Sequence, residues 1–118
     1  MSILAALVLD ASLTPVQIAS AVGDPLDLRL LPISPGVRDA FANTAKWGTP
    51  EQSTSDGTAA LLHMLVVYPD GKPVFPDLDA VTKAHRTAPI GSPLLTLGEK
   101  CVAHFGAAME AAKTGPKA

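Results

Sequence analysis

The chain has 118 residues, 47% hydrophobic and 17% charged, so length and composition suit one folded domain with its own core and exclude wholesale disorder. Its 9 basic and 11 acidic side chains give a net charge of -2, which is not the basic surface that nucleic acids or anionic membranes attract. One cysteine excludes an internal disulfide framework and fits a reducing compartment.

The first element is an apolar run, Ile3 to Leu9. We interpret it as part of a short helix over residues 2–12, with a buried strand as the alternative. No Lys or Arg precedes the run and Asp10 closes it after seven residues. This pattern argues against an export signal, and the run is too short to span a membrane.

A β-hairpin is predicted next, over residues 15–33. Thr14 to Val22 alternates in polarity, Gly23-Asp24 is a favoured two-residue turn, and Leu26 to Leu30 alternates again. Because an isolated hairpin is marginal in water, its leucine face needs cover. The following helices or another copy of the chain must supply that cover.

Two helices are expected in the next part of the chain. Ser34-Pro35 is an N-cap followed by proline at the first helical position, and it predicts a helix to about Lys46. Residues 49–57 have the composition of a solvated, movable loop. Residues 58–67 then read as a helix that is apolar on nearly every side. Such a helix is either the central core element or gives one face to a partner.

The chain reverses at Pro69-Asp70-Gly71, a favoured turn sequence. Two prolines then flank the pair Val74-Phe75, and prolines push their predecessors toward extended backbone. The pair is apolar enough to be buried. We therefore expect an ordered joint in which Phe75 is a fully buried plug.

The joint is followed by a helix over about 77–87. Asp77 suits its N-cap, Asp79 complements the positive end of the helix dipole, and Leu78, Val81 and Ala84 are expected to face inward.

A last helix is predicted to begin at Ser92-Pro93 and to reach about residue 112. Its apolar stripe consists of Leu94, Leu97, Cys101, Phe105 and Met109. Residues 113–118 are expected to be a flexible tail. The fold predicted is thus a single domain, 1–118, that is mainly α (α+β), with an N-terminal hairpin followed by a four-helix region over 34–112.

No catalytic or metal site is predicted, and no cofactor. Cys101 and His104 lie three residues apart, close enough to share a metal, but structural zinc needs four ligands and no second Cys/His pair exists. Cys101 also fits a small core hydrophobe. His63 and His85 have no sequence neighbour that completes a nucleophile–base pair, and Asp77 and Asp79 are explained by capping.

The order of these elements resembles the tail assembly chaperones of long-tailed bacteriophages. The likeness covers about residues 14–112 and centres on Asp70-Gly71-Lys72-Pro73-Val74-Phe75 followed by Asp77-Leu78-Asp79. Members of that family run D-G-x-P-(L/V)-F, then an acidic helix start, then a helix rich in Leu and Ala. The helix start at Ser34-Pro35 is also similar.

The resemblance implies a non-enzymatic protein of the host bacterial cytoplasm. Such a chaperone coats the long helical tape measure protein during tail assembly and leaves as tube subunits polymerise. A frameshifted, extended form commonly recruits the tail tube protein. The alternatives are a structural tail or head-tail component, and a binding or catalytic domain centred on Cys101 and His104.

Two expectations concern partners. The apolar helix at 58–67 and the leucine face of the hairpin lead us to expect self-association. We also expect Phe105 and Met109 to contact the partner, although a stripe at helical spacing is more often core than interface. Phe75 is expected to contact the partner if it lies at the surface instead of in the core. Phe105 and Met109 stand among alanines, a soft surface suited to varied apolar helices.

Overall fold

The computed structural model describes residues 13–20 and 23–114, which form a compact α+β globule. Its elements are β1 (Thr14–Ile18), β2 (Leu26–Leu30), α2 (Pro35–Ala45), α3 (Thr54–Leu65), β3 (Val66–Val67), α4 (Leu78–Thr87) and α5 (Pro93–Thr114). The α+β class, the N-terminal hairpin and the four helices of the 34–112 region are confirmed. The helix expected over residues 2–12 lies outside the described residues.

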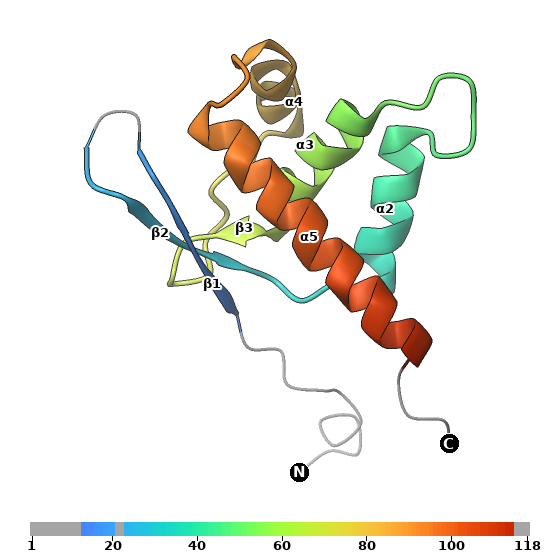
Figure 1. Cartoon of the computed structure of the whole chain (residues 1–118), viewed down its shortest axis with the longest axis horizontal. Helices are drawn as coiled ribbons and strands as arrows, with labels where there is room; N and C mark the ends of the chain where they lie inside the picture. The colour runs from blue at the N-terminus through green and yellow to red at the C-terminus, as the bar shows by residue number, and fades with distance from the viewer. Residues whose placement is uncertain (1–12, 21–22, 115–118) are drawn as a thin grey trace.

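Helix α3 is the centre of the fold. It contacts α2, α4, α5 and β3, and α5 crosses in front of it with the hairpin on one side and α2 on the other (Figure 1). Leu61, Leu62 and Leu65 on α3 are fully buried. Other helices of the same chain therefore supply the cover that this apolar helix needs.

The expected bounds of α3 were wrong at both ends. The helix begins at Thr54, inside the stretch assigned to a loop, because the Ser53 hydroxyl caps it by accepting the Asp56 N–H at 3.2 Å. It ends at Leu65, and the next two residues, Val66–Val67, form a third strand that was read as helix. Their β-branched side chains favour a strand once β2 offers a pairing edge.

The hairpin is present, but its turn differs from the expectation. Ile18 pairs with Leu26, so residues 19–25 connect the strands and Gly23-Asp24 is not a two-residue turn. Pro25 explains this, because a proline directly after that turn cannot donate to the ladder. Leu28 and Leu30 are buried at 4% and 3% exposure, so the leucine face is covered within the chain.

Strand β1 is an edge strand of the three-stranded sheet β1-β2-β3. The Leu31 N–H donates to the Leu65 carbonyl, so the alternation of an antiparallel ladder turns the backbone groups of Leu30 toward β1. Its partner Thr14 then faces β2, and Pro15 faces outward. An outward proline removes a donor from the edge and discourages pairing with another strand.

The remaining helix ends follow their capping signals. The Ser34 hydroxyl accepts the Val37 N–H at 3.2 Å, and Lys46 ends α2 in the left-handed region at φ 54°. Asp77 caps α4 by accepting the N–H groups of Asp79 and Ala80. The cap signals of α2 and α4 are thus confirmed.

Two expected details differ. On α4 only Val81 is buried, while Leu78 is 36% exposed and Ala84 is exposed, because α4 lies at the edge of the globule and packs on one side. Helix α5 continues to Thr114, two positions beyond its expected end. The rest of the expected tail, residues 115–118, lies outside the described residues.

Glycines at helix contacts provide a test of this packing. A Cβ added at Gly57 would lie 2.7 Å from the Phe41 ring and 2.8 Å from the Ala45 Cβ, so Gly57→Ala should destabilise the fold by about 1–3 kcal/mol. Gly106→Ala is the matched control, because nothing lies within 4 Å and alanine is the better helix former, by about 0.5–1 kcal/mol. Urea unfolding measures both, and equal effects of the two variants would contradict the close α2–α3 contact.

Candidate partner-binding groove

An open apolar hollow of about 260 Å³ lies between the hairpin, the joint and the start of α5. We call it the Phe75 groove. It is lined by Ile18, Leu26, Leu28, Tyr68, Val74, Phe75, Pro93, Leu94 and Leu97. All of these side chains are apolar except for the hydroxyl of Tyr68, so the groove is suited to hydrocarbon side chains rather than to a charged ligand.

The joint that forms one wall of the groove is fixed by its turn. The Asp70 carboxylate accepts the Lys72 N–H at 2.9 Å, and Gly71 adopts φ 90°, which a residue with a Cβ rarely takes. The Tyr68 N–H donates to the Lys72 carbonyl at 2.8 Å. The turn expected at Pro69-Asp70-Gly71 is therefore confirmed.

The exit of the joint is tied to α3 and β3. The Val74 N–H donates to the Val66 carbonyl at 3.2 Å, and the His63 ring donates from Nδ1 to the Phe75 carbonyl at 2.7 Å. A carbonyl only accepts, so this bond places the proton on Nδ1. His63, which had no assigned role, is thus the residue that positions the Phe75 backbone.

Phe75 is not the fully buried plug that we expected. It is half-buried and packs against the core with one part of its ring. The remainder lines the Phe75 groove and a second hollow on the α4 side. Among residues 13–20 and 23–114, no element passes over Phe75 to complete its burial.

Two exposed apolar side chains border the groove and were not identified from the sequence. Leu26 is 50% exposed and Tyr68 is 48% exposed. Leu26 shares the face of Leu28 and Leu30 but stands at the end of the hairpin, beyond the helices that cover the other two. The alternating pattern identifies the face, whereas the extent of its cover is a tertiary property.

Phe105 and Met109 lie elsewhere on the molecule. Phe105 is half-buried, and its ring centroid lies 4.9 Å from that of Phe41. Met109 is half-buried and borders a small hollow of about 160 Å³ with Ile33 and Pro35. Phe105 lies eleven positions after Leu94, which is roughly 16 Å along α5. The structure does not bring these two residues together with Phe75, and their contact with a partner stays a prediction.

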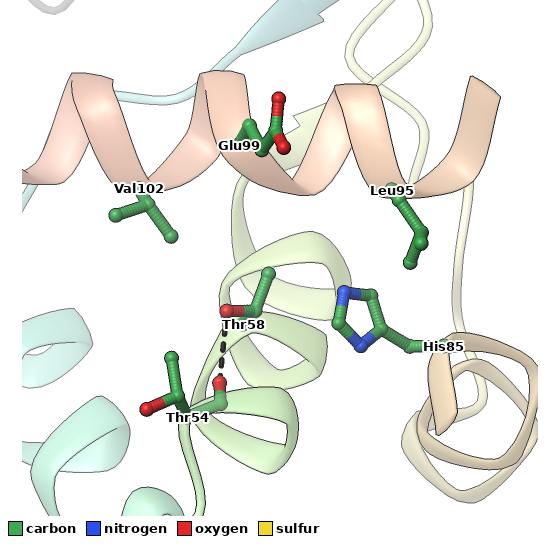
Figure 2. A pocket seen from close by; sticks show the side chains of 6 residues that line it. All are labelled: Thr54, Thr58, His85, Leu95, Glu99 and Val102. Carbon is green, nitrogen blue, oxygen red and sulfur yellow. Dashed lines mark hydrogen bonds between the residues drawn. The ribbon is translucent and has the colours of Figure 1, made fainter. Parts of the chain in front are cut away.

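A larger hollow, of about 370 Å³, lies between α3, α4 and α5. Figure 2 shows Leu95 and Val102 pointing into it from α5 and His85 from α4, opposite Thr58 of α3. The Thr58 hydroxyl donates to the Thr54 carbonyl at 2.9 Å and so remains engaged within its own helix. Of the polar side chains that line this hollow, Thr58 is thus engaged within α3 and His85 is engaged with Ser55.

His85 and Arg86 fasten α4 to α3. The Ser55 hydroxyl lies 2.7 Å from His85 Nδ1, and Arg86 contacts both carboxylate oxygens of Asp56 at 2.8 and 2.7 Å. The serine–histidine distance would suit a nucleophile and its base. Asp56, whose charge acts on His85, gives both oxygens to Arg86, so it does not orient the imidazole as the acid of a triad would.

Cys101 and His104 do not share a site. Cys101 is fully buried, and burial raises the pKa of its thiol to about 12, so it stays protonated and matches the expected core residue. His104 donates from Nε2 to the Leu31 carbonyl at 2.9 Å. Within residues 13–20 and 23–114, no group of three or more His, Cys, Asp or Glu side chains could hold a metal.

Comparison with known proteins adds no relative. No protein-family model matches the chain, and neither a curated protein nor a solved structure is significantly similar to it. Among the described helices, none is long and apolar enough to cross a membrane.

The partial burial of Phe75 predicts a moderate cost of truncation. Phe75→Ala should lower the free energy of unfolding by about 1–3 kcal/mol, below the 3–5 kcal/mol typical of a fully buried phenylalanine. Tyr68→Ala, at the exposed rim, should stay within about 0.5 kcal/mol of the parent. Chemical denaturation tests both. A decrease in the free energy of unfolding of more than about 4 kcal/mol for Phe75→Ala would indicate that this side chain is fully buried.

The position of His85 predicts a pH dependence of stability. Burial lowers the pKa of His85 below its ordinary 6.5, opposed by the charge of Asp56, so the unfolded chain takes up this proton first. The contribution of His85 is fully present above pH 6.5 and is lost as the pH falls below that value. Melting temperatures between pH 8 and pH 5 should therefore fall less in His85→Gln than in the parent.

Asp56 acts in a lower pH window. The Arg86 hydrogen bond holds the pKa of Asp56 below its ordinary 3.8, so its stabilisation is present above pH 3.8 and is lost as the pH falls through the lowered value. The control Asp56→Asn removes the charge that opposes the lowering of the His85 pKa, so its slope between pH 8 and pH 5 should be at least as steep as that of the parent. An unchanged slope in His85→Gln would contradict the assignment to His85.

Proposed function

We propose that this protein is a tail assembly chaperone that binds the tape measure protein of a phage or of a phage-derived tail. It acts in the cytoplasm of the host bacterium, covers apolar stripes of the tape measure helix, and is released as the tube assembles. The resemblance over residues 14–112 motivates this proposal. Covering the tape measure helix does not require a chemical reaction from the chain, so binding alone performs the function.

The observation that carries the proposal is the Phe75 groove. It is apolar and open, and its lining includes Val74 and Phe75, the last two residues of the segment 70–75 on which the resemblance centres. Amphipathic helices are commonly held by laying their apolar face into a hydrophobic groove. The segment that defines the likeness therefore also forms a surface on which a tape measure helix can lie.

The shape of the groove also suits release. Its hollow of about 260 Å³ is smaller than the pockets that enclose drug-sized ligands, so each chaperone covers only a few side chains. A few apolar side chains contribute roughly 1.5–3 kcal/mol each when fully buried. Many chaperone molecules, each bound weakly along the long tape measure helix, can keep this helix soluble and still dissociate one at a time.

The two observations that led us to expect self-association no longer support it. Both the apolar helix α3 and the leucine face of the hairpin are covered within the chain. Self-association remains a prediction. The large apolar side chains exposed on the described surface are Leu26, Trp47, Tyr68, Leu78, Ile90 and Val102, of which Leu26 and Tyr68 border the Phe75 groove.

Co-expression tests the proposed function directly. The tape measure protein encoded beside this chain should be largely insoluble when expressed alone and soluble when expressed with it. Leu26→Asp, at the groove rim, should abolish this effect because it places a charge where an apolar side chain must lie. Val102→Asp is the matched control, since Val102 is 42% exposed and lies at the other hollow.

Three outcomes would count against the proposal. Equal insolubility of the tape measure protein with and without the chain removes the chaperone function. Retention of the chain in purified particles favours the structural alternative. Equal protection by Leu26→Asp, with loss of protection in Met109→Asp, moves the binding surface to the far end of α5. Circular dichroism of each variant distinguishes lost binding from lost folding.

A further inference from the structure

The Phe75 groove continues into a second apolar hollow. This hollow, of about 280 Å³, lies on the α4 side and is lined by Val74, Phe75, Pro76, Asp77, Ala80, Val81, Ala84 and Leu94. Val74, Phe75 and Leu94 border both hollows. They form a ridge with one recess toward the hairpin and another toward α4.

We propose that this double recess binds one amphipathic helix of basic character, with a large aliphatic side chain in each hollow. The inference rests on the proposed function, since it specifies which segments of the tape measure protein the groove selects. The two side chains lie three or four residues apart on the partner helix, on either side of the Phe75 ridge.

The spacing of the two side chains on the partner helix is inferred from the position of the ridge between the two hollows. Side chains three or four positions apart on one helix face have Cβ atoms about 5–6 Å apart, which leaves room for a ridge one side chain wide between them. Side chains two positions apart point to different faces and cannot enter both hollows. Each hollow is too small for a folded element and large enough for one big side chain.

The basic character of the partner helix is inferred from the charged residues in the segments around the ridge. Residues 24–29 and 68–84 carry Asp24, Asp27, Asp70, Asp77 and Asp79 against Arg29, Lys72 and Lys83, and Lys83 pairs with Asp79 at 3.2 Å. These two short segments hold a net charge of -2, as much as the whole chain. The start of α5, Pro93 to Leu97, adds no charged residue. A helix with Lys or Arg beside its apolar pair is attracted to this surface, and an acidic helix is repelled.

Synthetic helical peptides with the full chain test the inference. The first peptide has two leucines four positions apart in an Ala/Lys background, the second has the leucines two apart with the same composition, and the third replaces Lys by Glu. Calorimetry at low salt should show binding of the first at least ~10-fold tighter than of the others, because the second cannot bury both leucines. Raising the salt to 0.5 M should weaken binding of the first peptide several-fold.

A pair of variants locates the binding. Ala80 is exposed and lines the α4-side hollow, so Ala80→Trp fills this hollow and should reduce binding of the first peptide ~10-fold or more. Ala103→Trp is the matched control, because Ala103 is exposed on α5 and lines neither hollow. Thermal melts show whether both variants fold.

The outcomes separate this inference from the proposed function. Equal binding of the first peptide and either of the other two, or no effect of Ala80→Trp in a folded variant, overturns the inference. If the chain still solubilises the tape measure protein in that case, the chaperone function stands without it. If the peptides are discriminated as expected while the tape measure protein is not protected, the groove chemistry stands and the proposed function fails.

Discussion

The burial of α3 on all sides is the constraint on which the rest of the structure depends. No single neighbour can cover a helix whose Leu61, Leu62 and Leu65 are all inaccessible to solvent. The chain meets this requirement with α2, α4, α5 and the sheet, and Gly57 allows α2 to approach closely. The hydrophobic free energy gained along α3 thus fixes the positions of elements that have few strong contacts with each other.

The end of α3 then determines where the groove lies. The chain passes from Leu65 directly into β3, and β3 pairs with β2 and with the returning segment at Pro73. His63 on the last turns of α3 holds the Phe75 carbonyl. Phe75 is therefore placed by α3 from one side only, which leaves its other side facing solvent between the hairpin and α4.

Local signals account for most of what could be predicted. Some roles depend only on hydrogen bonds to residues at most three positions away, as for Ser34, Asp77 and the Asp70-Gly71 turn. Such roles can be predicted from the local sequence. The strand at Val66–Val67 depends on β2, far away in the chain, and its apolar residues also suit a helix. The early start of α3 was hidden by a polar first turn that resembles a loop.

The groove was predictable only in part for the same reason. Phe75 stands in a recognisable motif, but Leu26 and Leu94 join it from other elements, and no local pattern relates the three.

Helices α3 and α4 differ in how firmly their positions are fixed. Helix α3 is fixed by close packing, whereas α4 buries one side chain, Val81, and is otherwise fastened by Ser55–His85 and Asp56–Arg86 near its C-terminal end. Polar contacts of exposed groups stabilise less than close packing does. Helix α4 borders the second hollow and is held by one buried side chain and these polar contacts, so it is the wall of the groove that can adjust most easily. A groove with one fixed wall and one adjustable wall can accept aliphatic side chains of different shapes, as a cover for a long helix of varied sequence requires.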